Sequence, residues 1–282
     1  MRREKKPRSY KEIVEIPEKL REELPTSFDV IGDIALIKIP ETLCEYKKEV
    51  AESFLKTYKN IKTVCNISPV SGELRTRYIE IIGGKEKTVT IHREYGAEFK
   101  VDIEKTYFSP RLANERKKIA DKVRENEVVI DMFTGVAPFP IIIAKHASPK
   151  IIYGIEKNND AVKIAKENIK INKVPDKIEI IHNDAENAQQ IFDKKDIKAD
   201  RIIMNLPFSA YLFFEEALKI AKEDCIIHYF DFLTEEEIGK RKVYLNEIAV
   251  NNGIQIVNIS FEKVKSYSPR EFYIRMDITV KK

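Results

Sequence analysis

Short apolar strands alternate with helical segments from residue 109 onward, and this alternation constrains the fold more than any other feature of the chain. Four predicted strand cores, IIYGI, IEIIH, RIIM and CIIHYF, are rich in Ile and contain few polar residues. Strands of this kind are typical of parallel sheets that helices cover on both faces. The sequence therefore predicts an α/β domain built on a mostly parallel sheet over residues 109–282.

The predicted elements of this domain follow the order of a Rossmann-like fold. A helix is expected at residues 111–123, with Ser109-Pro110 as its N-cap and first position. Strands are predicted at residues 128–133, 150–157, 178–185, 200–206, 224–232, 254–264 and 271–280, and helices at 138–147, 159–173, 211–223 and 234–253. The last two strands are expected to pair antiparallel at one edge. A seven-stranded sheet with its last strand inserted antiparallel is typical of class I methyltransferases.

The first 108 residues have a different pattern and are predicted to form a smaller α+β domain. In residues 41–58 the apolar side chains recur every three or four positions, as one face of a helix requires. Short strands are predicted at residues 33–39, 62–67, 75–82, 88–94 and 97–103. The last two flank Tyr95-Gly96, a turn signal, and are expected to form a hairpin. Two domains, 1–108 and 109–282, are therefore expected.

Composition excludes several classes of protein. No apolar run approaches the roughly 20 residues of a membrane span, and the basic start of the chain lacks the apolar part of a secretory signal, so a cytoplasmic protein is expected. Cys44, Cys65 and Cys225 are far apart and the four histidines are scattered, which predicts neither disulfides nor a bound metal. A net charge of +4 is too small to identify a nucleic-acid partner by itself.

The first strand-turn-helix of the α/β domain, VVIDMFTGVAPF, is the expected cofactor site, because ligands of open α/β sheets bind beyond the carboxyl ends of the strands. Asp131 closes the strand, and Gly135 allows the backbone to approach a ligand closely. The dinucleotide pattern GxGxxG is missing, since Ala137 and Pro140 stand where it requires glycine. That argues against NAD and its pyrophosphate, whereas a nucleoside without phosphate makes no such demand.

Acidic residues also end the next two strands. Glu156 lies 21 residues after Gly135, where a carboxylate can accept hydrogen bonds from both ribose hydroxyls. Asp184 follows the third strand and could accept a hydrogen bond from an adenine amino group. Each acid alone could simply cap a strand or a helix. Three successive strand ends with such residues favour a nucleoside site.

The turn Asn205-Leu206-Pro207-Phe208 follows the fourth strand of the sheet. An [ND]-x-P-[FY] turn at this place is typical of methyltransferases that act on planar nitrogen. There the Asn amide and backbone carbonyls hold the acceptor, and an aromatic side chain packs on the base. The alternative interpretation is an ordinary Asn/Pro turn, which the position at the end of this strand disfavours.

In these motifs and in several further stretches, the chain resembles the archaeal and eukaryotic tRNA (guanine-37-N1)-methyltransferases and their wyosine-pathway relatives. The matching stretches, within about residues 20–280, are SGELRTRYIEIIGG, TIHREYG, YFSPRLANERKKIA, DMFTGVAPF, GIEKN, IMNLPF, IHYF and VKSYSPREF. The resemblance implies S-adenosylmethionine as the cofactor and tRNA, through its anticodon stem-loop, as the partner. It implies methylation of the purine at position 37, in the first place at N1 of guanosine, by a monomeric enzyme.

The resemblance also implies residue roles. Methylation of guanine N1 needs a base that removes the N1 proton and a positive group that stabilises charge on O6. Glu115 is implied as the base and Arg75 as the cation, with Asn205 and Pro207 completing the catalytic set. The implied binding residues are Asp131, Phe133, Gly135, Glu156, Asp184 and Asn205 for the cofactor, and Tyr107, Arg111, Arg116 and Phe208 for the RNA.

Periodicity alone favours simpler interpretations of some of these residues. Glu115 lies four positions from Arg111, as in an ordinary helix-surface ion pair. Arg75 could lie on a solvated strand face. The basic N-terminal residues, Arg2 and Arg3 among them, could contact phosphates or belong to a frayed terminus.

The acceptor atom stays open at this point. Some members of the family methylate C7 of 4-demethylwyosine, the tricyclic wyosine precursor at position 37, alone or in addition to N1. Relatives that transfer an aminocarboxypropyl group usually lack the SPRLxxER signature, which is intact here and favours methyl transfer. Ala137 replaces the glycine of the family's GVGPF. Many members carry a further N-terminal domain that contacts the tRNA elbow, and no segment here is long enough to form it.

Two functions outside this family are also considered. Methyltransferases of exocyclic amino groups share the [ND]-x-P-[FY] turn, but they need no arginine beside a neighbouring oxygen, so the ELRTR strand argues against them. A non-catalytic RNA-binding module with a decayed cofactor pocket is the other alternative. The intact Glu115, Glu156 and Asn205 argue against it.

Overall fold

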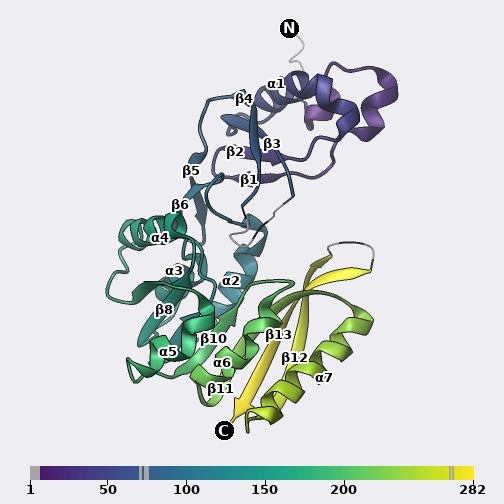
Figure 1. Cartoon of the computed structure of the whole chain (residues 1–282). Coiled ribbons are helices and arrows are strands. Elements are labelled where there is room, and N and C mark those ends of the chain that lie inside the picture. Colours follow the sequence, from purple (N-terminus) through teal and green to yellow (C-terminus); the bar gives the residue numbers. More distant parts are fainter. Residues whose placement is uncertain (1–6, 70–71, 73–75, 267, 269) are drawn as a thin grey trace. The chain divides into compact units, whose positions relative to one another are not determined.

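The computed structural model describes residues 7–69, 72, 76–266, 268 and 270–282 and divides into two compact units, Met1–Leu112 and Ala113–Lys282. The course of the chain can be followed in Figure 1. Each unit has its own sheet and its own apolar core. The expected α/β class of the chain, with a smaller unit before a Rossmann-like one, is confirmed.

The first unit holds a four-stranded sheet of order β1-β2-β3-β4 and a separate two-stranded sheet, β5-β6. Its strands are β1 Asp29–Ile31, β2 Ile34–Ile37, β3 Thr63–Ile67, β4 Ile79–Gly84, β5 Val89–Glu94 and β6 Ala97–Asp102. Its helices are α1 Lys47–Thr57 and the 3₁₀ turns η1 Tyr10–Glu12, η2 Glu18–Glu23, η3 Glu41–Tyr46 and η4 Pro110–Leu112. The core packs between α1 and the sheet, with the Tyr10 and Phe54 rings 4.2 Å apart.

The hairpin expected around Tyr95-Gly96 is confirmed. Both residues have positive φ, 45° and 72°, as a two-residue turn with the twist of its strands requires. The short strand β1 was not predicted from the sequence. It pairs only with β2, and three residues are too few to give a pattern of burial.

The second unit holds a seven-stranded sheet of order β12-β13-β11-β10-β7-β8-β9. Its strands are β7 Val128–Asp131, β8 Ile151–Glu156, β9 Ile178–His182, β10 Ala199–Met204, β11 Ala221–Thr234, β12 Gln255–Ser266 and β13 Glu271–Lys281. Strands β7 to β11 pair in parallel, and β13 lies antiparallel between β11 and β12. The predicted Rossmann-like order, with the last strand inserted antiparallel, is confirmed.

The helices of this unit are α2 Ala113–Ala120, α3 Pro138–His146, α4 Asn159–Ile171, α5 Ala188–Asp193, α6 Phe214–Ile220 and α7 Glu235–Asn251, with 3₁₀ turns η5 Ala185–Asn187 and η6 Ala210–Phe213. Residues of β11 alternate between two environments. Tyr229 packs on Phe214 of α6, and Phe230 packs on Phe139 of α3. The sheet is therefore covered on both faces, which explains its nearly continuous apolar strands.

Two predicted helices have the wrong bounds, and one helix was missed. The helix expected over 211–223 ends at Ile220, because Ala221 pairs with β10 and begins β11. The helix expected over 111–123 is a 3₁₀ turn followed by α2, which ends at Ala120. The short helix α5 was not predicted. At the end of α6 a tertiary contact outweighs the local helix propensity of the residues.

Candidate active site

The cofactor turn connects β7 with α3 and is held by the end of β8. Gly135 has φ of 55°, and its N–H donates to Oε2 of Glu156 at 2.7 Å. The N–H of Asn158 donates to Oε1 of the same carboxylate at 2.7 Å. Burial raises the pKa of Glu156, while these N–H donors oppose that rise. Two of the predicted cofactor residues, Gly135 and Glu156, are thus brought into direct contact.

Asp131 ends β7 and is fully buried. Its Oδ1 accepts from the N–H of Phe133 at 3.2 Å, and its Oδ2 has no hydrogen-bond partner among the residues that the structure describes. Burial raises the pKa of Asp131 to about 7, against the effect of the Phe133 N–H. An unpartnered buried carboxylate oxygen fits a site that a cationic or hydrogen-bonding ligand completes.

Asp131→Asn tests this burial. A carboxyl whose folded pKa lies above its unfolded value keeps its proton in the folded state, so its cost to stability grows as pH rises from about 4 to about 7 and is complete above that. We therefore expect the variant to gain stability over the parent by about 1.4 kcal/mol per pH unit across this window. Urea unfolding of both proteins at several pH values measures the difference. A difference independent of pH would contradict the burial of a titrating Asp131.

The third strand end carries Asp184, which caps η5 through the N–H of Glu186 at 3.1 Å and pairs with Lys157 Nζ at 2.6 Å. Burial acts to raise the pKa of Asp184, but the ion pair with Lys157 outweighs burial and holds this pKa below its usual value. On the other side of the turn the ring of Phe133 lies edge-on to Phe213, 5.1 Å away. The carboxyl ends of β7, β8 and β9 thus carry all the acids predicted to bind the cofactor.

Glu156→Ala should weaken S-adenosylmethionine binding by about 1–3 kcal/mol, because it removes an acceptor and leaves the N–H groups of Gly135 and Asn158 without their partner. Isothermal titration calorimetry measures the affinity. Glu179→Ala on the neighbouring strand β9, where the carboxylate pairs with Lys195 at the surface, is the matched control and should bind as the parent does. Parent-like affinity in Glu156→Ala would remove Glu156 from the site.

The turn after β10 is held by two other strands. The hydroxyl of Tyr273 in β13 donates to Oδ1 of Asn205. The N–H of Phe208, a residue with φ of 72°, donates to the buried carboxylate of Asp231 in β11 at 3.0 Å. Pro207 between them is buried. The turn is therefore fixed at both ends, which is what a site that positions a substrate requires.

Aromatic rings continue from this turn across one face of the sheet. Phe208 is 50% exposed and stacks on Phe232 at 4.8 Å, Phe232 lies 4.7 Å from Tyr273, and Tyr273 stacks on Phe230 at 5.7 Å. Phe230 in turn contacts Phe139 of α3. The outer ring, Phe208, is open to solvent on one side, and its packing on a base stays a prediction.

Glu115 and Arg116 lie on α2 and are both buried. The Arg116 guanidinium lies over the ring of Phe139 at 6.0 Å. Glu115 does not form the surface pair with Arg111 that its spacing suggests. Its Oε2 accepts from Arg275 of β13, and its Oε1 pairs with Lys118 Nζ at 2.9 Å.

Arg275 connects Glu115 to a stripe of buried charges across the sheet. It pairs with Asp277 and Glu262 at 2.8 Å each. Asp277 accepts from Nδ1 of His228, whose Nε2 accepts from Arg201, since arginine can only donate. Burial lowers the pKa of His228 to about 4, which agrees with this neutral ring.

The other predicted RNA-binding and catalytic residues belong to the first unit or lie outside the described residues. Tyr107 and Arg111 belong to the first unit, where Arg111 pairs with Asp29 at 2.5 Å. Arg75 lies outside the described residues, as do Arg2 and Arg3. Among the described residues no cluster of metal-ligating side chains is found, and no helix there is long and apolar enough to cross a bilayer.

Tyr273, Arg275 and Asp231 were not predicted as site residues from the sequence. The sequence does contain a signal for Arg275. Arg275 and Asp277 are charged residues at alternate positions of an otherwise apolar strand, which places both on one buried face. Charges in such a place need partners, and the partners lie far away in the sequence.

Comparison with known proteins identifies the family. The chain matches the TRM5/TYW2 methyltransferase domain over residues 90–257 and the TYW2 N-terminal domain over residues 10–88. It is 41% identical to the tRNA (guanine(37)-N(1))-methyltransferase Trm5b of Pyrococcus abyssi over 278 residues, 98% of this chain and 81% of that protein. It is 34% identical to the tRNA(Phe) (4-demethylwyosine(37)-C(7)) aminocarboxypropyltransferase of Methanocaldococcus jannaschii, over 89% of this chain and 96% of that one.

Solved structures agree with these matches. The complex of aTrm5 with tRNALeu has a TM-score of 0.82 at 36% identity and covers 98% of this chain and 78% of its own. The complex of M. jannaschii TYW2 with AdoMet has a TM-score of 0.69 at 29% identity and covers 91% and 100%. The resemblance seen in the sequence motifs is therefore confirmed, and the chain belongs to the TRM5/TYW2 methyltransferase family.

Proposed function

We propose that the chain is an S-adenosylmethionine-dependent tRNA methyltransferase that places the methyl group on N1 of guanosine 37. Family membership and the name of the 41% identical relative support the reaction, and AdoMet in a solved relative supports the cofactor. The structural observation that carries the proposal lies on β13. Tyr273 contacts Asn205, and Arg275, two residues on and on the same face, contacts Glu115.

This arrangement puts the Glu115 carboxylate and the Asn205 amide on one side of the sheet. Their partners on β13, Arg275 and Tyr273, are two residues apart, which is roughly 7 Å along a strand. Guanine N1 carries a proton and becomes a good nucleophile only as that proton leaves. Glu115 is the one acidic residue of α2 and is proposed to accept it. Asn205 and the carbonyls of its turn hold the edge of the base, and Phe208 packs on the face. S-adenosylmethionine supplies the electrophilic methyl group when bound.

The ion pairs of Glu115 indicate which oxygen takes the proton. Arg275 is 2% exposed and fixes Oε2, whereas the Lys118 side chain beside Oε1 is 46% exposed and also pairs with Glu262. If Lys118 turns fully toward Glu262, Oε1 is released while Oε2 stays fixed. We propose Oε1 as the acceptor and Arg75 as the cation at O6 of guanine.

The main alternative keeps the tRNA position and changes the atom. Relatives at 29% identity include a 4-demethylwyosine(37)-methyltransferase of Saccharolobus solfataricus and a bifunctional enzyme of Nanoarchaeum equitans that is named for both acceptors. Methylation at C7 also removes a proton from the acceptor, so Glu115 could serve either reaction. The higher identity to the N1 enzyme favours guanosine.

The acceptor is tested with two tRNA substrates, one with guanosine at position 37 and one with the tricyclic precursor. After incubation with S-adenosylmethionine, nucleoside mass spectrometry identifies the methylated product. We expect 1-methylguanosine from the first tRNA. Methylation of only the precursor would overturn the choice of N1, and no product from either tRNA would overturn the proposed function.

Binding of tRNA should depend strongly on salt, because phosphate contacts release counterions. Each contact contributes a slope of about 0.7–0.9 to the plot of log Kd against log salt, so Arg111→Gln should lower the slope by about one if Arg111 contacts a phosphate. Filter binding between low and moderate salt measures both slopes. A flat profile for the parent would argue that RNA is not the substrate.

A further inference from the structure

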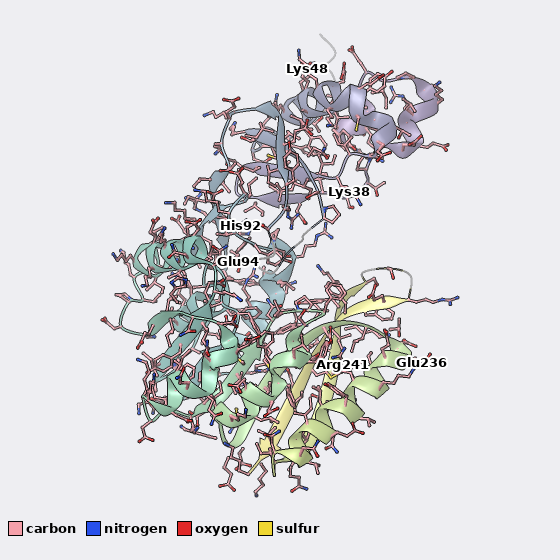
Figure 2. The ribbon with its side chains drawn as sticks, in the orientation of Figure 1. Lys38, Lys48, His92, Glu94, Glu236 and Arg241 are labelled. Atoms are coloured by element: carbon pink, nitrogen blue, oxygen red, sulfur yellow. The ribbon has the colours of Figure 1, made fainter. Side chains whose placement is uncertain are left out.

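A pocket of the second unit lies beside η6, the 3₁₀ turn that follows the reaction turn, Asn205–Phe208. It has a volume of about 370 Å³ and is lined by Tyr211, Leu233, Glu237, Lys240, Arg241 and Tyr244. Tyr211 comes from η6, three residues after Phe208, and Leu233 is close to the carboxyl end of β11. The other four residues lie on α7 between Glu237 and Tyr244, and Figure 2 labels Arg241 among them and the nearby Glu236. None of these residues belongs to the proposed catalytic or cofactor-binding set.

The walls of this pocket combine aromatic surface with positive charge. The guanidinium of Arg241 lies over the ring of Tyr211, 4.3 Å from its centre. The Tyr244 ring stands edge-on to Tyr211 at 6.0 Å and is 43% exposed. An exposed tyrosine beside an arginine–tyrosine pair is a surface on which a planar ring can stack, and such stacking accepts any base.

The pocket is linked to the reaction turn through one buried carboxylate. Asp231 is 1% exposed and pairs with Arg241 at 3.4 Å. The same carboxylate accepts from the N–H of Phe208 at 3.0 Å, the N–H of Phe232 at 2.9 Å and the hydroxyl of Tyr229 at 2.6 Å. A ligand that orders Arg241 would therefore stabilise the Asp231 carboxylate, which fixes the Asn205–Phe208 turn.

The charges of the pocket favour a base over a free anion. Glu237 lines the pocket together with Lys240 and Arg241, and two further acids, Glu235 and Glu236, lie in the same first turn of α7, where Glu236 pairs with Lys240. The carboxylates of these acids repel an isolated phosphate. A nucleobase has both donors and acceptors on its edge and carries no charge there, so carboxylate and guanidinium can both contact it.

We propose that this pocket holds the base of a nucleotide adjacent to position 37 while the target base occupies the Asn205–Phe208 turn. The inference rests on the proposed tRNA substrate. A base that leaves its stack to be methylated exposes the faces of its neighbours. One neighbouring base would recover its lost stacking on the Tyr244 ring. Because Asp231 contacts both Arg241 and the Phe208 N–H, binding of this base would also stabilise the turn that holds the target base.

The test uses the full chain and three tRNA transcripts, which have a normal anticodon loop, an abasic site at position 36 or an abasic site at position 38. Tyr244→Ala should raise the Kd for the normal tRNA by about 5- to 150-fold, the weight of one stacked base. On one of the two abasic tRNAs the variant and the parent should bind equally, because the base that Tyr244 contacts is already missing. Tyr244→Phe keeps the ring and should bind like the parent.

Val250→Ala, also exposed on α7, is the matched control and should bind every tRNA as the parent does. S-adenosylmethionine affinity reports that Tyr244→Ala is folded. Parent-like tRNA binding by Tyr244→Ala, or the same loss on all three tRNAs, would overturn the second subsite. If the parent itself methylates none of the tRNAs, the proposed function has failed instead.

Discussion

Replacement of Glu115 with Gln should slow single-turnover methylation of tRNA by about 10²–10⁴-fold, the usual contribution of a positioned base. Gln has nearly the same shape but cannot accept the N1 proton, and its single amide oxygen can accept from only one of Lys118 and Arg275. Rapid-quench measurement with enzyme in excess over tRNA is needed, since multiple-turnover rates can report product release. Raising the pH should restore part of the rate, because solvent then removes more of the proton.

The matched control is Asp121→Asn, which makes the same chemical change just beyond α2. Asp121 is an exposed carboxylate that pairs with Lys117, so its amide variant should methylate at the parent rate. Affinity for S-adenosylmethionine and for tRNA should stay close to the parent value in both variants. If Glu115→Gln is as fast as the parent, Glu115 is only structural and the proton leaves by another route.

Arg275→Leu should destabilise the second unit by about 3–5 kcal/mol, the cost of breaking a buried ion pair from one side. Arg275 is 2% exposed and contacts the carboxylates of Glu115, Glu262 and Asp277. Without it, the buried Glu115 carboxylate keeps only Lys118 as an ion-pair partner among the described residues. Urea unfolding followed by circular dichroism measures the free energy of unfolding.

Lys122→Gln serves as the control for this variant. Lys122 also pairs with Asp277, but its side chain is 45% exposed, and an exposed pair contributes about 1 kcal/mol or less. A free energy of unfolding for Arg275→Leu within that range of the parent would show that the buried stripe of charges adds nothing to stability. Activity alone could not show this, because Arg275 also fixes Glu115.

The sequence predicted the second unit well because its strands are buried on both faces and its helices are periodic. The cofactor turn could also be placed, since ligand sites in such sheets follow strand ends, and Gly135 and Glu156 do contact each other. The end of α6 could not be predicted. Residues 221–223 continue a helical pattern, and only the pairing of Ala221 with Ala199 of β10 makes them a strand.

The contacts that complete the site could not be predicted for a related reason. Glu115 meets Arg275 across 160 positions of sequence, and Asn205 meets Tyr273 across 68. Local spacing instead suggested that Glu115 pairs with Arg111 on a helix surface. The choice between these partners depends on the face of the sheet that α2 covers, which neither propensity nor periodicity encodes.

The central claim, methyl transfer to N1 of guanosine 37, is tested most directly with S-adenosylmethionine that carries one isotope in its methyl group and a second in its carboxyl group. After reaction with a tRNA that has guanosine at position 37, the RNA is digested and both isotopes are counted in each nucleoside. We expect the methyl isotope alone, in 1-methylguanosine from position 37. The carboxyl isotope in the RNA would indicate aminocarboxypropyl transfer, and a methyl group at another nucleoside would contradict the assigned position.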